Sequence, residues 1–161
     1  MRHASFAPIV DAQAEILILG SLPGAASLAA GRYYAHPRNQ FWRLIGAVIG
    51  VDLAALGYED RLAALLEHRI GLWDVIADAE RAGSLDAAIR NVAANDLRSL
   101  ATSLPALRTI GFNGGTSARI GRAQLGDLVD RLRLVALPSS SPAFTLPFET
   151  KLAAWQKLLH D

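Results

Sequence analysis

Short aliphatic runs alternate with longer amphipathic stretches along the chain. The aliphatic runs stop at glycine, asparagine, proline or aspartate, and they predict four strands at residues 15–20, 70–76, 107–112 and 131–138. Apolar side chains at helical spacing, among them Phe41, Leu44 and Val48, predict a helix over residues 39–50. Similar patterns predict further helices at residues 58–69, 84–91, 95–104 and 147–159, and one more after the glycines at 114–115.

The order of these elements determines the expected fold class. Strands separated by helices imply parallel strands with helices on both faces. We therefore expect an α/β protein, a three-layer α/β/α sandwich with a four-stranded, mainly parallel central sheet. No internal repeat, low-complexity stretch or linker divides the chain, so residues 1–161 form a single expected domain.

Composition excludes several classes of site. The chain contains no cysteine, which rules out disulfides, cysteine-bound iron–sulfur clusters and a thiol nucleophile. The four histidines lack the spacing of a metal site, and no apolar run approaches the roughly 20 residues of a membrane span. We expect a cytoplasmic monomer without metal or cofactor. The net charge of +1 gives no general support for nucleic-acid binding, which requires a local surface.

Polar turns follow all four predicted strands. They read "GSLPG" from Gly20, Asp74 with its neighbours, "NGG" from Asn113, and "SSSPA" from Ser139. Because ligands bind beyond the carboxyl ends of parallel strands, we expect these turns to converge on one site. The stretch "YYAHPRNQFW", residues 33–42, is too aromatic for a plain loop and is expected to join them. Taken singly, each segment could equally be a tight turn or a helix cap.

In this order the segments resemble the uracil-DNA glycosylase superfamily. "GSLPG" is similar to its first motif, "HPRNQFW" to the matching segment of mismatch-specific members, and "LPSSSPA" to its second motif, a loop that enters the minor groove. The combination is most similar to the hypoxanthine-DNA (deoxyinosine) glycosylase branch, and it covers nearly the whole chain. The resemblance implies damaged DNA as the partner and base flipping with hydrolysis of an N-glycosidic bond as the activity.

Two positions depart from the family pattern. Many relatives carry Asp or Asn, which handles the attacking water, where this chain has Leu22, and His or Asn where it has Ser139. In the hypoxanthine branch the catalytic asparagine lies in the "HPxN" segment, which matches Asn39. The alternative for Asn39 is a helix cap, a role for which asparagine is well suited.

The resemblance also implies roles for other residues. Tyr34 would stack on the extruded base, and an ionised Asp74 would accept the ring N–H that hypoxanthine and uracil share, unless Asp74 only caps a helix. The remaining expected base-site residues are Gly20, Ser21 and Asn113. The expected DNA contacts are Ser139, Ser140, Ser141 and Arg38.

Three functions stay open at this point. The first is a monofunctional glycosylase for deaminated bases, since Lys151 and Lys157 lie on the last predicted helix rather than at the expected site. The second is a mismatch-specific uracil or thymine glycosylase, which would usually want Asp or Asn in place of Leu22. The third is a catalytically silent module of the same fold that binds DNA or a nucleotide.

Overall fold

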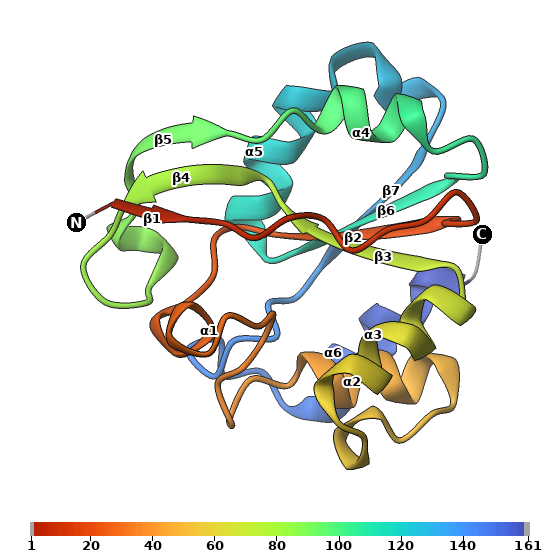
Figure 1. Ribbon diagram of the computed structural model, residues 1–161, viewed down its shortest axis with the longest axis horizontal. Helices are drawn as coiled ribbons and strands as arrows, with labels where there is room; N and C mark the ends of the chain where they lie inside the picture. The colour runs from red at the N-terminus through yellow and green to blue at the C-terminus, as the bar shows by residue number, and fades with distance from the viewer. Residues whose placement is uncertain (1, 160–161) are drawn as a thin grey trace.

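The computed structural model describes residues 2–159, and four parallel strands form its central sheet (Figure 1). The strand order is β3-β2-β6-β7, and all three pairings are parallel. The strands are β2 (Ile16–Gly20), β3 (Ile70–Asp74), β6 (Thr109–Asn113) and β7 (Arg133–Leu137). These are the four strands that the aliphatic runs predict, so the expected fold class is confirmed.

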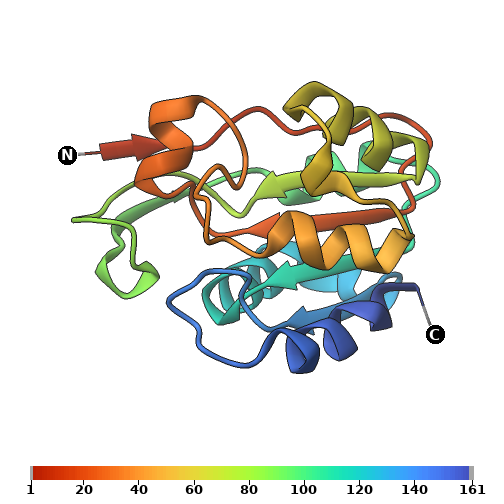
Figure 2. The same cartoon turned by 90° about the horizontal axis from the view of Figure 1, so that it is seen from below.

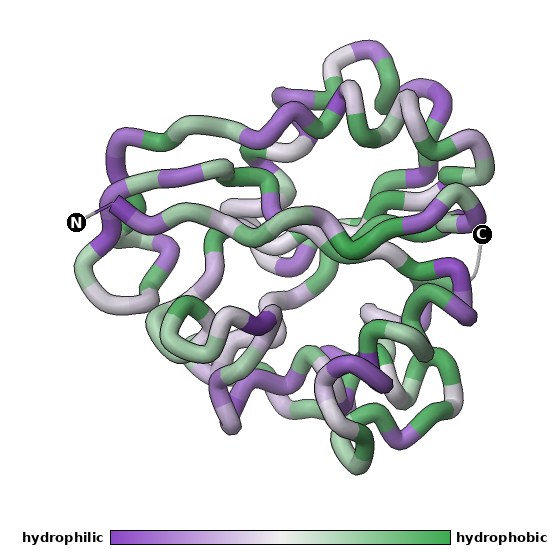
Figure 3. Tube along the Cα trace, in the orientation of Figure 1, coloured by the Kyte–Doolittle hydropathy of each residue, from purple (hydrophilic) through white to green (hydrophobic). Residues whose placement is uncertain are grey.

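Helices cover both faces of this sheet, and the side chains of β2 show why. Ile16 and Ile18 pack into one apolar cluster, while Leu17 and Leu19 pack into a second cluster on the opposite face, as the period of two along a strand requires. The first cluster is covered by α2 (Phe41–Ile49), α3 (Tyr58–Glu67) and α6 (Phe148–Trp155), and the second by α4 (Leu97–Ser103) and α5 (Gly115–Leu125). Figure 3 shows the strands between them as mainly hydrophobic.

The remaining helical segments are short. Helix α1 (Ala25–Ala30) follows β2 and lies on the side where the parallel strands end (Figure 2). Four single turns of 3₁₀ helix are η1 (Leu53–Ala55), η2 (Asp86–Ala88), η3 (Gly126–Asp130) and η4 (Gln156–Leu159). None of the helices within residues 2–159 has both the length and the apolar character needed to cross a bilayer.

A second sheet, which the sequence did not predict, stands beside the first. It is antiparallel, has the order β1-β4-β5, and consists of β1 (Arg2–Ala4), β4 (Ile76–Glu80) and β5 (Arg90–Ala94). The predicted helix at 84–91 is therefore wrong. Ser84, at the start of this segment, instead accepts the N–H of Ala25 at 2.9 Å, at the start of α1, and Asp86 accepts the hydroxyl of Ser21 at 2.8 Å. The side chains of Ser84 and Asp86 therefore bond distant segments instead of the first turn of a helix.

The predicted strand 70–76 belongs to both sheets. Val75 separates β3 from β4, and its N–H donates to the Gly20 carbonyl at 2.8 Å. The Asn95 amide stabilises this crossing, because its Nδ2 donates to the carbonyls of Asp74 at 2.7 Å and Ile76 at 3.2 Å. One continuous segment thus links the parallel sheet to the antiparallel one just where Asp74 ends β3.

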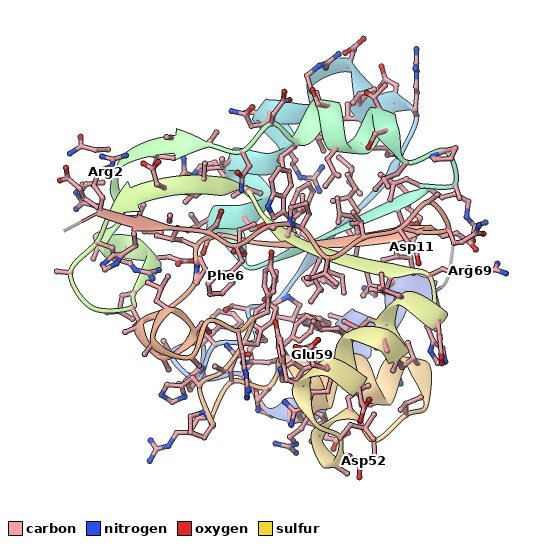
Figure 4. The ribbon with its side chains drawn as sticks, in the orientation of Figure 1. Arg2, Phe6, Asp11, Asp52, Glu59 and Arg69 are labelled. Carbon is pink, nitrogen blue, oxygen red and sulfur yellow. The ribbon has the colours of Figure 1, made fainter. Side chains whose placement is uncertain are left out.

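Charged side chains cover the outside of this framework. Figure 4 labels Arg2, Asp11, Asp52, Glu59 and Arg69, all of them exposed. Glu15 forms ion pairs with Arg69 at 2.6 Å and Arg108 at 2.8 Å at the end of the sheet where the parallel strands begin. Phe6, also labelled, meets the buried ring of Tyr33 edge-on, with 5.2 Å between the ring centroids. The polar turns that follow the strands lie at the opposite end of the sheet.

Replacing Asn95 with alanine tests the crossing between the sheets. The substitution leaves the carbonyls of Asp74 and Ile76 without their donor, so it is expected to lower the free energy of unfolding by about 1–3 kcal/mol. Urea denaturation followed by circular dichroism measures this loss. Gln156→Ala at an exposed position is the control, with an expected change below about 0.5 kcal/mol. Equal stability of the two variants would contradict the assignment.

Candidate functional site

A cavity of about 630 Å³ lies where the parallel strands end, and the expected turns converge on it. Its size is within the range of sites for small molecules and nucleobases, about 300–1,000 Å³. Nine of the ten predicted site residues line it, namely Gly20, Ser21, Tyr34, Asn39, Asp74, Asn113, Ser139, Ser140 and Ser141. Arg38 is exposed outside the cavity lining, in the same segment as Asn39.

Asp74 and Gly20 are neighbours across the sheet, and their proximity explains the glycine. They are register partners at the ends of β3 and β2. A Cβ on Gly20 would lie 2.6 Å from Oδ1 of Asp74 and 3.0 Å from the hydroxyl of Tyr34, closer than packing allows. The missing side chain leaves room for the Asp74 carboxyl group beside the cavity.

The Asp74 carboxyl group is buried but incompletely hydrogen-bonded. Only 4% of the residue is exposed, and Oδ2 has no hydrogen-bond partner among residues 2–159. Burial, followed by the negative charge of Asp86, raises the pKa of Asp74 to about 7, against a smaller opposing effect of Arg81. Asp74 is not a helix cap, since it ends a strand and leads into another.

Tyr34 carries its ring into the cavity from an unusual backbone conformation. Its φ of 53° is left-handed, which is uncommon for a residue with a side chain. One face of the ring stacks on Phe41, with 3.9 Å between centroids and 8° between planes. Its hydroxyl accepts from Nδ2 of Asn113 at 3.3 Å, and burial raises its pKa, so it stays protonated. The stacked face is covered, so a ligand could use only the opposite face or the edge.

The Asn39 side chain bonds the start of α2 through its oxygen, although the N-cap residue of that helix is Gln40. Its Oδ1 accepts the N–H of Phe41 at 2.9 Å, at the start of α2, and the hydroxyl of Ser140 at 2.8 Å. Its Nδ2 has no acceptor among the described residues, and the half-buried side chain lines the cavity. The oxygen is engaged in structure while the two amide N–H donors remain available.

Ser140 connects Asn39 to the end of β6. Its hydroxyl accepts from Nδ2 of Asn113 at 2.9 Å, and its N–H donates to Oδ1 of Asn113 at 2.9 Å. Ser140 is 1% exposed, in contrast to the half-buried Ser139 and Ser141. The three serines of the predicted DNA loop are thus not equivalent, because the middle one faces the interior.

Buried Arg81 and half-buried Asp86 form a charged pair beside Ser21 that the sequence pattern did not predict. The Arg81 side chain, 1% exposed, donates to the carbonyls of Leu22, at 3.5 Å, and Pro23, and it lies 3.7 Å from Oδ1 of Asp86. Burial raises the pKa of Asp86, which also lines the cavity. Neither residue follows a strand of the parallel sheet. Only the wrongly predicted helix at 84–91 drew attention to Asp86, so no pattern in the sequence marked the pair.

Comparison with known proteins places this geometry in context. The family model of the uracil DNA glycosylase superfamily matches residues 7–161. A hypoxanthine DNA glycosylase of Methanosarcina barkeri (strain Fusaro / DSM 804) is 44% identical over 117 residues, which span 73% of this chain and 74% of that one. A protein of the same name from Methanosarcina acetivorans is 46% identical over 114 residues, which span 71% and 72% of the two chains.

A solved structure is similar over the full length. It is a solution NMR structure from Methanosarcina acetivorans, described only provisionally as a uracil DNA glycosylase. It has a TM-score of 0.84 and 38% identity, and the match covers 99% of this chain and 100% of that one. The match therefore covers the whole α/β/α fold.

The raised pKa of Asp74 predicts how stability depends on pH. The folded protein holds this proton up to about pH 7, whereas the unfolded chain releases it near the ordinary value of about 4. The free energy of unfolding should therefore fall as the pH rises, by about 3 kcal/mol between pH 5 and pH 8. In Asp74→Asn this part of the loss should disappear, and urea denaturation at pH 5 and pH 8 measures it. An unchanged difference between the two pH values would show that Asp74 titrates normally.

Proposed function

Because the chain belongs to the uracil DNA glycosylase superfamily, we propose that it is a monofunctional DNA glycosylase that flips out deaminated bases, hypoxanthine above all, and hydrolyses their N-glycosidic bond. Both curated relatives carry the name hypoxanthine DNA glycosylase. Such an enzyme begins base excision repair on DNA. The base must leave the helix, since a stacked base is inaccessible to the enzyme.

The observation that carries this proposal is the buried carboxyl group of Asp74. Above about pH 7, where Asp74 loses its proton, the carboxylate only accepts hydrogen bonds, and Oδ2 has no donor among the described residues. Hypoxanthine and uracil present a ring N–H beside a carbonyl, whereas adenine and cytosine present a bare ring nitrogen at that position. Asp74 therefore pairs with hypoxanthine or uracil and repels adenine and cytosine, the bases from which they arise by deamination. The N–H supplies the partner that Oδ2 lacks in the free protein.

Tyr34 provides the surface on which the base rests. Phe41 covers one face of its ring, at 3.9 Å between centroids, and fixes the plane of the other. A base stacked on an aromatic ring gains about 1–3 kcal/mol without regard to sequence. The Tyr34 hydroxyl accepts a hydrogen bond from Asn113, so the ring is oriented before the substrate arrives. Gly20 and Ser21 also line the cavity, and their small size leaves space for the base beside the Tyr34 ring.

Asn39 positions the water that attacks the sugar. Cleavage builds positive charge on the sugar and negative charge on the leaving base. The free Nδ2 donors of Asn39 hold the water by one lone pair, while Ser140 and the Phe41 N–H fix Oδ1. An amide cannot act as a strong base, so departure of the base precedes or accompanies attack. Leu22, buried at 6% exposure, takes no part in proton transfer.

The serine loop contributes in two ways. Ser140 and Asn113 bond one another and orient Asn39 from within. Ser139, Ser141 and Arg38 contact phosphates, which positions the duplex without reading its sequence. Lys151 donates to the Ser141 carbonyl at 3.3 Å, and this buried position supports hydrolysis rather than a Schiff-base mechanism.

Excision from defined duplexes tests the function. The protein is incubated with separate duplexes that contain inosine, uracil, or only normal bases, and alkaline heating then breaks the strand at any abasic site. Cleavage at inosine is expected, with none in the normal duplex. Cleavage at uracil alone would assign the mismatch-type activity instead. Cleavage at neither base would leave a silent binding module and contradict the proposal.

Asn39→Asp separates the two roles of this side chain. The carboxylate keeps an acceptor for Phe41 and Ser140 but loses the Nδ2 donors, so the fold should be retained. Single-turnover excision of hypoxanthine should fall by about a hundredfold or more, as for other positioned polar groups. Asn39→Ala should show the same loss with a lower melting temperature, because the cap is lost as well. Normal excision by folded Asn39→Ala would leave Asn39 with a structural role alone, whereas normal excision by Asn39→Asp only would show that a carboxylate can hold the water in its place.

A further inference from the structure

Lys151 is a buried cation beneath the serine loop. It lies in the first turn of α6 and is 1% exposed. Its Nζ donates to the carbonyl of Ser141 at 3.3 Å and lies 5.5 Å from the ring centre of Phe144. The side chain thus reaches from the last helix to the underside of the loop that closes one side of the cavity.

The ammonium group of Lys151 lacks a negative partner in the free protein. Among residues 2–159, no carboxylate forms an ion pair with it, and burial alone lowers its pKa. One hydrogen bond uses one of the three ammonium donors. Buried charges are normally paired, because the loss of hydration is otherwise uncompensated. The position of Lys151 therefore costs stability unless an anion comes close when the protein is in use.

The loop above Lys151 offers donors to such an anion. Ser139 Oγ accepts the N–H of Ser141 at 3.1 Å, and Ser141 Oγ accepts the N–H of Ala143 at 3.2 Å. Each hydroxyl keeps its own proton, for which the described residues provide no acceptor. Both serines are half-buried and line the cavity. Two available O–H donors two residues apart, over a buried positive charge, match the oxygens of a phosphodiester.

We propose that Lys151 is the buried positive charge of a phosphodiester-binding site formed by Ser139 and Ser141, and that the backbone beside the extruded nucleotide supplies its missing anion. The inference rests on the proposed function, since DNA provides the phosphate. Lys151 is a positioning residue rather than a catalytic one. It fixes the Ser141 carbonyl by its hydrogen bond and attracts the phosphate through the low-dielectric loop, where charge acts more strongly than in water.

Binding to a duplex with a tetrahydrofuran abasic site tests this role without any chemistry. Fluorescence anisotropy gives the Kd as a function of NaCl for the wild type, Lys151→Met, Lys151→Gln and Lys157→Met. Glutamine keeps a polar amide at this position but carries no charge, so comparison with methionine separates the effect of the charge from that of polarity. Lys157, exposed at the end of the chain's last helical segment, is the matched control for the loss of one lysine.

Both Lys151 variants are expected to bind about threefold to tenfold more weakly at low salt. Their plots of log Kd against log salt should be flatter by up to about one unit, while Lys157→Met keeps the wild-type slope. The melting temperature distinguishes this role from a purely structural one, because the two roles predict changes of opposite sign. Removing an unpaired buried charge should leave the Tm of Lys151→Met unchanged or higher, whereas loss of a structural contact alone would lower it.

The outcomes keep this inference separate from the proposed function. A wild-type salt slope and affinity in Lys151→Gln would overturn the role of the charge, even if the wild type excises hypoxanthine normally. A wild type that excises neither hypoxanthine nor uracil would defeat the proposed function, while the salt dependence would still decide the role of Lys151.

Discussion

A short chain of buried hydrogen bonds, from Asn113 through Ser140 to Asn39, holds the candidate site together. Asn113 and Ser140 exchange two bonds of 2.9 Å each, and the Ser140 hydroxyl donates to Asn39 at 2.8 Å. These bonds join the end of β6, the loop after β7 and the start of α2, segments that lie far apart in the sequence. In a low-dielectric interior such a network is rigid because each unmet bond would be costly. The free Nδ2 of Asn39 is therefore oriented by this network together with the Phe41 N–H of its own segment.

Some charged groups around the cavity are incompletely partnered within the described part of the chain, unlike the amides of Asn113 and Asn39, which are linked through Ser140. The amide network is satisfied, whereas Oδ2 of Asp74 and Nε of Arg81 have no partner among residues 2–159, and Lys151 has no anion there. Each of these groups costs stability in the free protein. In the proposed complex, the base N–H would approach Asp74 and a backbone phosphate would approach Lys151. Only the contact with Asp74 depends on the base, so only that contact would favour a flipped hypoxanthine or uracil.

The sequence predicted the parts of the site that follow local rules. Aliphatic runs identified all four parallel strands, and parallel strands bring their carboxyl ends to one edge, so Gly20, Asp74, Asn113 and the serine loop could be placed together in advance. Features that depend on contacts between distant segments could not be predicted. Ser84 and Asp86 resemble a helix start, yet their side chains bond α1 and Ser21, and the chain forms β5 instead. Likewise, nothing in the local pattern of α6 reveals that Lys151 points inward beneath the serine loop.

The central claim is that the cavity receives a flipped deaminated base, with Asp74 reading its ring N–H. A crystal structure of the protein with a duplex containing 2′-fluoro-deoxyinosine, whose N-glycosidic bond resists cleavage, tests it most directly. The account predicts hypoxanthine stacked on the free face of Tyr34, with its N1–H within about 3 Å of a carboxylate oxygen of Asp74. A base that remains stacked in the helix, or that enters the cavity with its N1–H directed away from Asp74, would contradict it.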